Sequence, residues 1–213
     1  MSLKYRYGRP MPQRLLTLEE PGQPLLFDAD RGLVAEVSGR HGIDALVAEL
    51  AAKNEDEAAK AFARFGREVM KSTIELADGK YLDRTGEVIE KVAAQTGISF
   101  PHRVERYVEL ALIGSRPLDR WNVAKATTRE LCLQVFSCAV QGRIAEKGPS
   151  FKGLPCKALC LTLFEEAARK TGDPVRVEMD KNIPDDGVCQ FSASLVAAPA
   201  AKRRRRAALA STG

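Results

Sequence analysis

Cysteine is the residue type in this 213-residue chain with the most distinctive possible chemistry, and all five cysteines lie between residues 129 and 195. They are Cys132, Cys138, Cys156, Cys160 and Cys189. Cys156 and Cys160 are four residues apart near the start of an expected helix, so their sulfur atoms share one helical face. In the last expected strand, residues 188–195, alternation places Cys189 on the apolar side with Phe191. We therefore expect sulfur atoms from a sheet and an adjoining helix to meet around one enclosed space.

Three chemistries fit such a cluster. A thiolate nucleophile can attack a carbonyl or amidine-like carbon while Asp186, Glu130 or His102 handles protons. Four thiolates can hold zinc, although the spacings are not those of Cys-x-x-Cys knuckles. All five cysteines can also be small core residues, since free cysteine is among the most buried residue types. The zinc alternative uses Cys138, Cys156, Cys160 and Cys189.

The start of the helix predicted over residues 155–170 favours negative charge. Pro155 suits the first helical position, which places Cys156 at the second, among unpaired backbone N–H groups at the positive end of the helix dipole. Lys157 adds a cation. We expect the Cys156 thiol to ionise more readily than a free thiol, whose pKa is about 8.5. The same N–H groups are an alternative binding site for an anionic ligand.

A second group of candidate binding residues lies in the loop that precedes the expected sheet. Arg116 and Arg120 flank the only tryptophan, Trp121, together with Asp119. An arginine beside a tryptophan can bind a small carboxylate while the ring covers the apolar side of the ligand. The alternative is a tryptophan that plugs the edge of the core, with its arginines outside. His102, in the first turn of the preceding helix, is either a surface residue or an acid or base of this site.

The order of elements predicts an α+β fold with N-terminal helices followed by a mostly antiparallel sheet with one inserted helix. Helical periodicity covers residues 42–53, 55–77, 83–95 and 101–113, and the last of these has an apolar stripe that includes Val104, Val108 and Leu112. Strands are expected at 121–125, 129–138, 175–179 and 188–195, with the helix 155–170 between them. The strand 129–138 is apolar on both faces and is expected to be central.

A resemblance to known families adds to this interpretation. Cys138, then Cys160 on a helix, then a Val-x-Val strand and Asp185-Asp-Gly-Val-Cys189-Gln-Phe191 resemble two related groups. One is the L-2-amino-thiazoline-4-carboxylic acid hydrolase family, and the other is the small-molecule-binding domain associated with vinyl reductases. Both close with a Gly-Asp-x-x-Cys-x-Phe strand, and the likeness covers roughly residues 55–195.

The resemblance implies a protein that binds a small anionic molecule and hydrolyses a C–N bond in a non-peptide ring. Cys138, Cys160 and Cys189 match its pattern, and with Asp186 they form the expected catalytic set. The expected substrate-binding residues are Arg116, Arg120, Trp121, Cys156, Lys157 and His102. The expectation includes no cofactor, with zinc as the exception weighed above. The alternative function is a non-catalytic small-molecule-binding or sensor domain, with or without a structural zinc.

Composition bounds the domain organisation. Residues 1–40 are expected to form an extended arm with a hairpin between Leu25–Phe27 and Leu33–Val37, residues 41–198 a single α+β domain, and residues 199–213 a disordered basic tail. The run Lys202–Arg206 carries five positive charges, equal to the whole net charge of +5. The remainder is electrically balanced, so no specific nucleic-acid partner is expected.

The same composition bears on location and partners. The chain has neither an apolar signal sequence at its start nor an 18-residue apolar run, so we expect a cytoplasmic protein without a membrane partner. An odd number of cysteines favours reduced thiols. Apart from its small-molecule substrate, the expected partner is a second copy of the chain, as a homodimer or another homo-oligomer. The N-terminal arm is either a strap across such a dimer or a loosely packed terminus.

Overall fold

A computed structural model describes residues 5–6, 9–10, 29–51, 53–147 and 155–196. Helices come first and a four-stranded sheet follows, interrupted by helices. A separate two-stranded pair, β1 (Tyr5–Arg6) and β2 (Arg9–Pro10), precedes them. The helices are α2 (Arg31–Arg40), α3 (Ile43–Leu50), α4 (Glu55–Glu75), the π-helix η1 (Leu76–Lys80), α5 (Arg84–Thr96), α6 (His102–Ser115), α7 (Ala139–Glu146), α8 (Lys157–Thr171) and α9 (Ile183–Asp186).

The sheet is antiparallel, with the order β3-β4-β6-β5. Its strands are β3 (Arg120–Ala126), β4 (Glu130–Ser137), β5 (Val175–Lys181) and β6 (Cys189–Leu195). Between β4 and β6 the register pairs Leu133 with Phe191 and Val135 with Cys189. All four of these side chains are buried, because alternation along both strands sends them to the same face.

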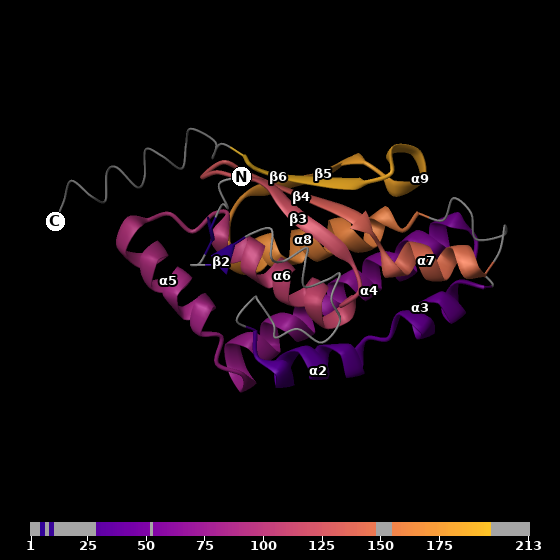
Figure 1. The fold of residues 1–213 in the computed structure, drawn as a ribbon, viewed down its shortest axis with the longest axis horizontal. Coiled ribbons are helices and arrows are strands. Elements are labelled where there is room, and N and C mark those ends of the chain that lie inside the picture. Colours follow the sequence, from indigo (N-terminus) through magenta and orange to yellow (C-terminus); the bar gives the residue numbers. More distant parts are fainter. Residues whose placement is uncertain (1–4, 7–8, 11–28, 52, 148–154, 197–213) are drawn as a thin grey trace.

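The core lies between that face and the helices (Figure 1). α8 packs against β5 and against α4, and it also contacts α6, while α2 covers α6 on the side away from the sheet. Phe164 of α8 stacks on Phe191 of β6, with 5.8 Å between the ring centroids. The helical layer and the sheet therefore share one continuous core.

The longest helix, α4, shows how its sequence specifies its position. Asn54 caps it by accepting from the Glu57 backbone N–H, while the Glu57 side chain accepts from the Asn54 backbone N–H. Three acidic residues follow in the first turn, where the helix dipole favours them. Its apolar face, with Phe62 and Val69 fully buried, turns toward α8 and α6.

The α+β class, the helices-first order and the central position of β4 are confirmed. The hairpin strand expected at Leu33–Val37 is wrong, because these residues lie in α2, where Asp30 caps the helix through the Gly32 and Leu33 backbone N–H groups. Helix α7 was not predicted. Its glycine and charged residues suggest a loop, yet Val140 and Ile144 are buried against the core.

The proposed division of the chain remains a prediction. Most of the N-terminal arm and the basic tail at 199–213 lie outside the described residues. Among the helices of the described part, none combines the length and the apolar character needed to cross a membrane.

A glycine determines how closely α4 and α8 approach. A Cβ atom on Gly66 would lie 2.2 Å from the backbone oxygen of Leu159, so a side chain there would force the helices apart. Gly142, in the exposed part of α7, has no atom within 4 Å of the equivalent position.

We predict that Gly66→Ala lowers the free energy of unfolding by about 1–3 kcal/mol, because the added methyl overpacks the helix contact. Gly142→Ala is the matched control and should raise it by about 0.5–1 kcal/mol through helix propensity. Urea unfolding of both variants measures the difference. Equal effects at the two positions would contradict the close contact between α4 and α8.

Candidate functional site

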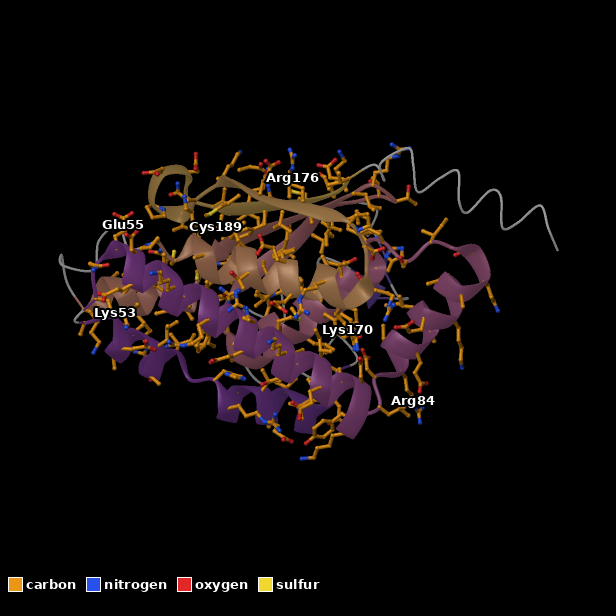
Figure 2. All side chains as sticks on the ribbon, turned by 180° about the vertical axis from the view of Figure 1, so that it is seen from behind. Lys53, Glu55, Arg84, Lys170, Arg176 and Cys189 are labelled. Atoms are coloured by element: carbon orange, nitrogen blue, oxygen red, sulfur yellow. The ribbon has the colours of Figure 1, made fainter. Side chains whose placement is uncertain are left out.

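Four segments meet at one end of the sheet: the turn after α6, the junction of β4 with α7, the start of α8 and the start of β6. The turn contributes Arg116 and Asp119, and the junction contributes Cys138. The start of α8 contributes Cys156 and Cys160, and the start of β6 contributes Cys189. In Figure 2, Cys189 lies toward the same end of the molecule as Glu55, the first residue of α4, and Arg84 lies at the other end. We call these six residues the Arg116 cluster.

Arg116 is the centre of the cluster. Its side chain is only 2% exposed, and its Nη1 donates to Cys160 Sγ at 3.4 Å and to Cys138 Sγ at 3.9 Å. Its Nε lies 3.3 Å from Asp119 Oδ2. Asp119 is completely buried, and its Oδ1 accepts from the Ala139 backbone N–H at 2.7 Å. A buried ion pair thus joins the end of α6 to the start of α7.

The hydrogen bonds of this pair are poor for a buried guanidinium. Sulfur is a weak acceptor, and neither Arg116 Nε nor Asp119 Oδ2 has a hydrogen-bond partner among the described residues, although the two lie at ion-pair distance. Buried polar groups are nearly always satisfied, and a buried charge left short of partners is costly. The guanidinium therefore retains donor capacity that a stronger acceptor can use.

Burial determines the ionisation of the thiols. It raises the pKa of Cys138 to about 12 and that of Cys156 to about 11, and it also raises the pKa of Cys189. Burial raises the pKa of Asp119 as well, against the opposing effect of Arg116. For Arg116, burial acts to lower the pKa, but its interactions with Cys160, Asp119 and Cys138 outweigh this and keep the residue charged.

The expectation of an easily ionised Cys156 is therefore wrong. Cys156 is the N-cap of α8 rather than its second residue, and its sulfur accepts from Gln141 Nε2 at 2.7 Å. Desolvation exceeds the effect of the helix start and of that hydrogen bond. Cys189 accepts from the Ile183 backbone N–H at 3.3 Å.

The structure brings the expected cysteines together, with the exception of Cys132. Cys132 lies on the other face of β4 from the buried residues Leu131, Leu133 and Val135. No three histidine, cysteine or acidic side chains of the described ranges form a group that could hold a metal ion. The zinc alternative weighed from the sequence therefore has no support in the geometry of the described residues.

Most of the other expected site residues lie apart from the cluster. His102 is at the opposite end of α6, which spans about 20 Å, and its Nδ1 lies 3.9 Å from Glu105 Oε2. Trp121 is buried in the core, as the alternative interpretation had it, while Arg120 and Lys157 are exposed. Asp186 accepts from the Asn182 backbone N–H within the α9 turn.

Sequence reasoning named Arg116 but did not select Asp119 or Gln141. Asp119 follows Arg116 by three residues in a turn closed by a backbone hydrogen bond from Asp119 N to Arg116 O. An Arg-x-x-Asp spacing between a helix and a strand was the available signal. Nothing in the sequence indicated that both side chains are buried.

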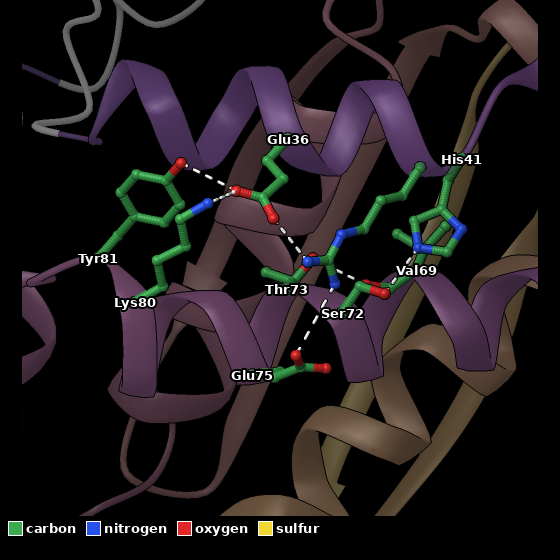
Figure 3. Close-up of polar contacts among 9 residues, drawn as sticks. Glu36, His41, Val69, Ser72, Thr73, Glu75, Lys80 and Tyr81 are labelled. Atoms are coloured by element: carbon green, nitrogen blue, oxygen red, sulfur yellow. Dashed lines mark hydrogen bonds and ion pairs between the residues drawn. The ribbon is translucent and has the colours of Figure 1, made fainter.

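A cavity of about 320 Å³ lies elsewhere, between η1, α5 and α6. Its wall includes Lys80 and Tyr81, which are held from outside by Glu36 of α2 (Figure 3). Lys80 Nζ and the Tyr81 hydroxyl donate to Glu36 Oε2 at 2.5 and 2.9 Å, and Arg40 donates to Oε1 at 2.6 Å. The hydrogen bonds from Lys80 and Tyr81 lower the pKa of Glu36 to about 2.

Comparison with known proteins gives no family for this chain. No protein-family model matches it, and no curated protein matches it. Solved structures do match over most of its length. A structure described as probing heme distortion in the H-NOX family is 13% identical, with a TM-score of 0.36 over 91% of this chain and 88% of that one.

Two further H-NOX structures give similar values. An Fe(II) unliganded mutant from K. algicida is 13% identical, with a TM-score of 0.36 and coverage of 88% and 95% of this chain and that one. A mutant from T. tengcongensis is 11% identical, with a TM-score of 0.35 and coverage of 78% and 94%. TM-scores this low do not establish a shared fold, so no property of these proteins is transferred to the present chain.

The comparisons correct the family assignment made from the sequence. The resemblance to the L-2-amino-thiazoline-4-carboxylic acid hydrolase family is wrong as a family assignment, because no family model matches the chain, and the hydrolase activity that rested on this resemblance loses its support. The expectation of no cofactor other than zinc differs from what one matched structure is described by, its heme, but a TM-score of 0.36 carries no cofactor over to this chain.

The cavity between η1, α5 and α6 does not fit a heme. Heme iron takes an axial histidine, cysteine, methionine or tyrosine. His41 Nε2 is 2.8 Å from Ser72 Oγ, and its ring packs edge-on against Phe65, while the cavity wall contains no histidine, cysteine or methionine. The cavity has two tyrosines, and their hydroxyls donate to Glu36 and Asp78. We therefore assign no role to heme.

The buried pair can be tested by a mutant cycle. We predict that Arg116→Met lowers the free energy of unfolding by about 3–5 kcal/mol, because it leaves the Asp119 carboxylate buried without its counter-charge. Adding Asp119→Asn should recover most of this loss, since asparagine keeps an acceptor for Ala139 N. Urea unfolding of the single and double variants gives the coupling energy. Additive losses would contradict an interaction between the two side chains.

Raised thiol pKa values predict slow alkylation. At about pH 8, iodoacetamide should modify Cys138 and Cys156 at least tenfold more slowly than a free cysteine, because the thiolate is the reacting form. Mass spectrometry of quenched peptides measures each rate, and a sample unfolded in urea is the control. Reaction at the rate of the unfolded sample would contradict the raised pKa values.

Proposed function

We propose that this chain is a non-catalytic small-molecule-binding or sensor domain that binds a small carboxylate at the Arg116 cluster. The observation that supports this most strongly is the state of Arg116. A guanidinium almost removed from water directs its Nη1 donor at two sulfur atoms and has no hydrogen-bonded carboxylate. A ligand carboxylate offers the strong, paired acceptors that this planar group prefers.

The chemistry of the surrounding thiols favours binding over catalysis. A nucleophilic cysteine works as a thiolate, but burial keeps Cys138 and Cys156 protonated near neutral pH. Asp186, the proposed general base, is engaged within its own turn. The protonated thiols of Cys138 and Cys156 are soft, weakly polar groups that suit contact with the apolar part of an organic anion.

Asp119 makes the binding of an anion depend on pH. A carboxylate beside Arg116 also approaches Asp119, and burial already raises the pKa of Asp119. Anion binding should therefore be accompanied by proton uptake at Asp119, which frees the guanidinium. Affinity then rises as the pH falls, provided that the ligand itself stays ionised.

The test uses benzoate as the probe and benzamide as its uncharged counterpart. We expect calorimetry to show benzoate binding that tightens as the pH is lowered, with benzamide much weaker. Arg116→Lys should weaken benzoate binding about tenfold or more, because lysine lacks the guanidinium fork. Arg176→Lys, on the exposed face of β5, is the matched control and should leave binding unchanged.

A second measurement needs no variant. Benzoate should slow the alkylation of Cys160 by iodoacetamide, because this sulfur lies 3.4 Å from the Arg116 nitrogen. Absence of benzoate binding at millimolar concentration, or equal binding by Arg116→Lys and Arg176→Lys, would refute the proposal.

A further inference from the structure

We propose that the cavity between η1, α5 and α6 is a second binding site, and that its ligand is a small organic ammonium ion. This site is separate from the Arg116 cluster and does not depend on the function proposed above. Its wall includes Asp78, Tyr81, Glu87, Arg103, Arg106 and Tyr107.

The shape of the cavity suits a small ligand. Its volume of about 320 Å³ is at the lower end of the range of about 300–1,000 Å³ found for small-molecule sites. One wall is the π-helix η1, where the helical hydrogen bonding of α4 widens before the chain turns at Tyr81. Segments of π-helix are rare and are frequently found at functional sites.

The cations of the wall already have carboxylate partners. Arg106 binds both oxygens of Asp83, at 2.9 and 2.7 Å, and Arg103 pairs with Glu90. Lys80 pairs with Glu36 from outside the cavity. An anionic ligand would have to displace one of these carboxylates before it could bind.

Glu87 differs from the other charged residues of the wall. It lies in the first turn of α5, and within the described part of the chain its carboxylate forms no ion pair or hydrogen bond. The uncompensated charge of the cavity is therefore negative. An ammonium ion supplies the missing partner without breaking an existing pair.

The two tyrosines supply the rest of the site. The Tyr81 hydroxyl donates to Glu36 and the Tyr107 hydroxyl donates to Asp78 at 2.8 Å, so both rings are held by carboxylates. Tyr81 already accepts a cation on its ring, since Lys80 Nζ lies 5.2 Å from the ring centroid. Aromatic faces attract ammonium groups, and the attraction strengthens as water is excluded.

The experiment titrates the full chain with benzylammonium, followed by amide NMR, with benzyl alcohol as the uncharged probe. We expect saturable shifts centred on Gly79, Gly86 and the neighbouring cavity residues, and weaker binding of the alcohol. Added salt should weaken the ammonium binding, because Glu87 is exposed.

Glu87→Gln should reduce the affinity for benzylammonium about three- to tenfold, by removing the unpaired charge. Glu165→Gln makes the same charge change on the exposed face of α8 and should leave the affinity unchanged. No binding at millimolar benzylammonium, shifts centred outside the cavity, or equal affinity in the two variants would overturn the proposal. Each of these results leaves the benzoate test at Arg116 unaffected.

Discussion

The buried ion pair of Arg116 and Asp119 is the interaction on which the arrangement of this molecule depends. It occupies the turn through which the chain leaves the helical layer and enters the sheet. Asp119 fixes the start of α7 through the Ala139 N–H, and Arg116 reaches Cys138, the N-cap of α7, and Cys160 of α8. Two charges removed from water are tolerated only if their geometry is held, and here four segments hold it.

The need to compensate buried charges also explains how α6 can bury its charged residues. Its sequence predicts a helix with one apolar stripe and an exposed polar side. The structure instead buries every residue from Val104 to Ser115, including Glu105, Arg106 and Glu109. Arg106 is accommodated because Asp83, just before α5, binds it with both oxygens. Periodicity therefore located this helix correctly but could not show that partners from other segments would bury its polar face.

In the candidate site, too, the sequence predicts what happens within one element but not how distant segments pack together. Local patterns sufficed to place Cys160 on a helix and Cys189 on the buried side of a strand, because alternation and helical spacing act within one element. Their convergence with Cys138 on one arginine depends on how distant segments pack. The ionisation of Cys156 was mispredicted for a related reason: the helix start is visible in the sequence, whereas the desolvation that outweighs it is not.

The two proposed sites lie near opposite ends of α6. The charge that each site prefers in a ligand follows from the partners that its buried arginine already has. Arg106 forms two hydrogen bonds with the Asp83 carboxylate, so its charge is already compensated. The nearby unpaired group is the Glu87 carboxylate. Arg116 lies close to one oxygen of Asp119 and otherwise donates to sulfur, so its N–H groups remain able to bind a stronger acceptor. The helix thus has an unpaired carboxylate near its first half and guanidinium donors without strong acceptors just beyond its end. Because a ligand gains most where it completes existing interactions rather than replaces them, the first site should select cations and the second should select anions.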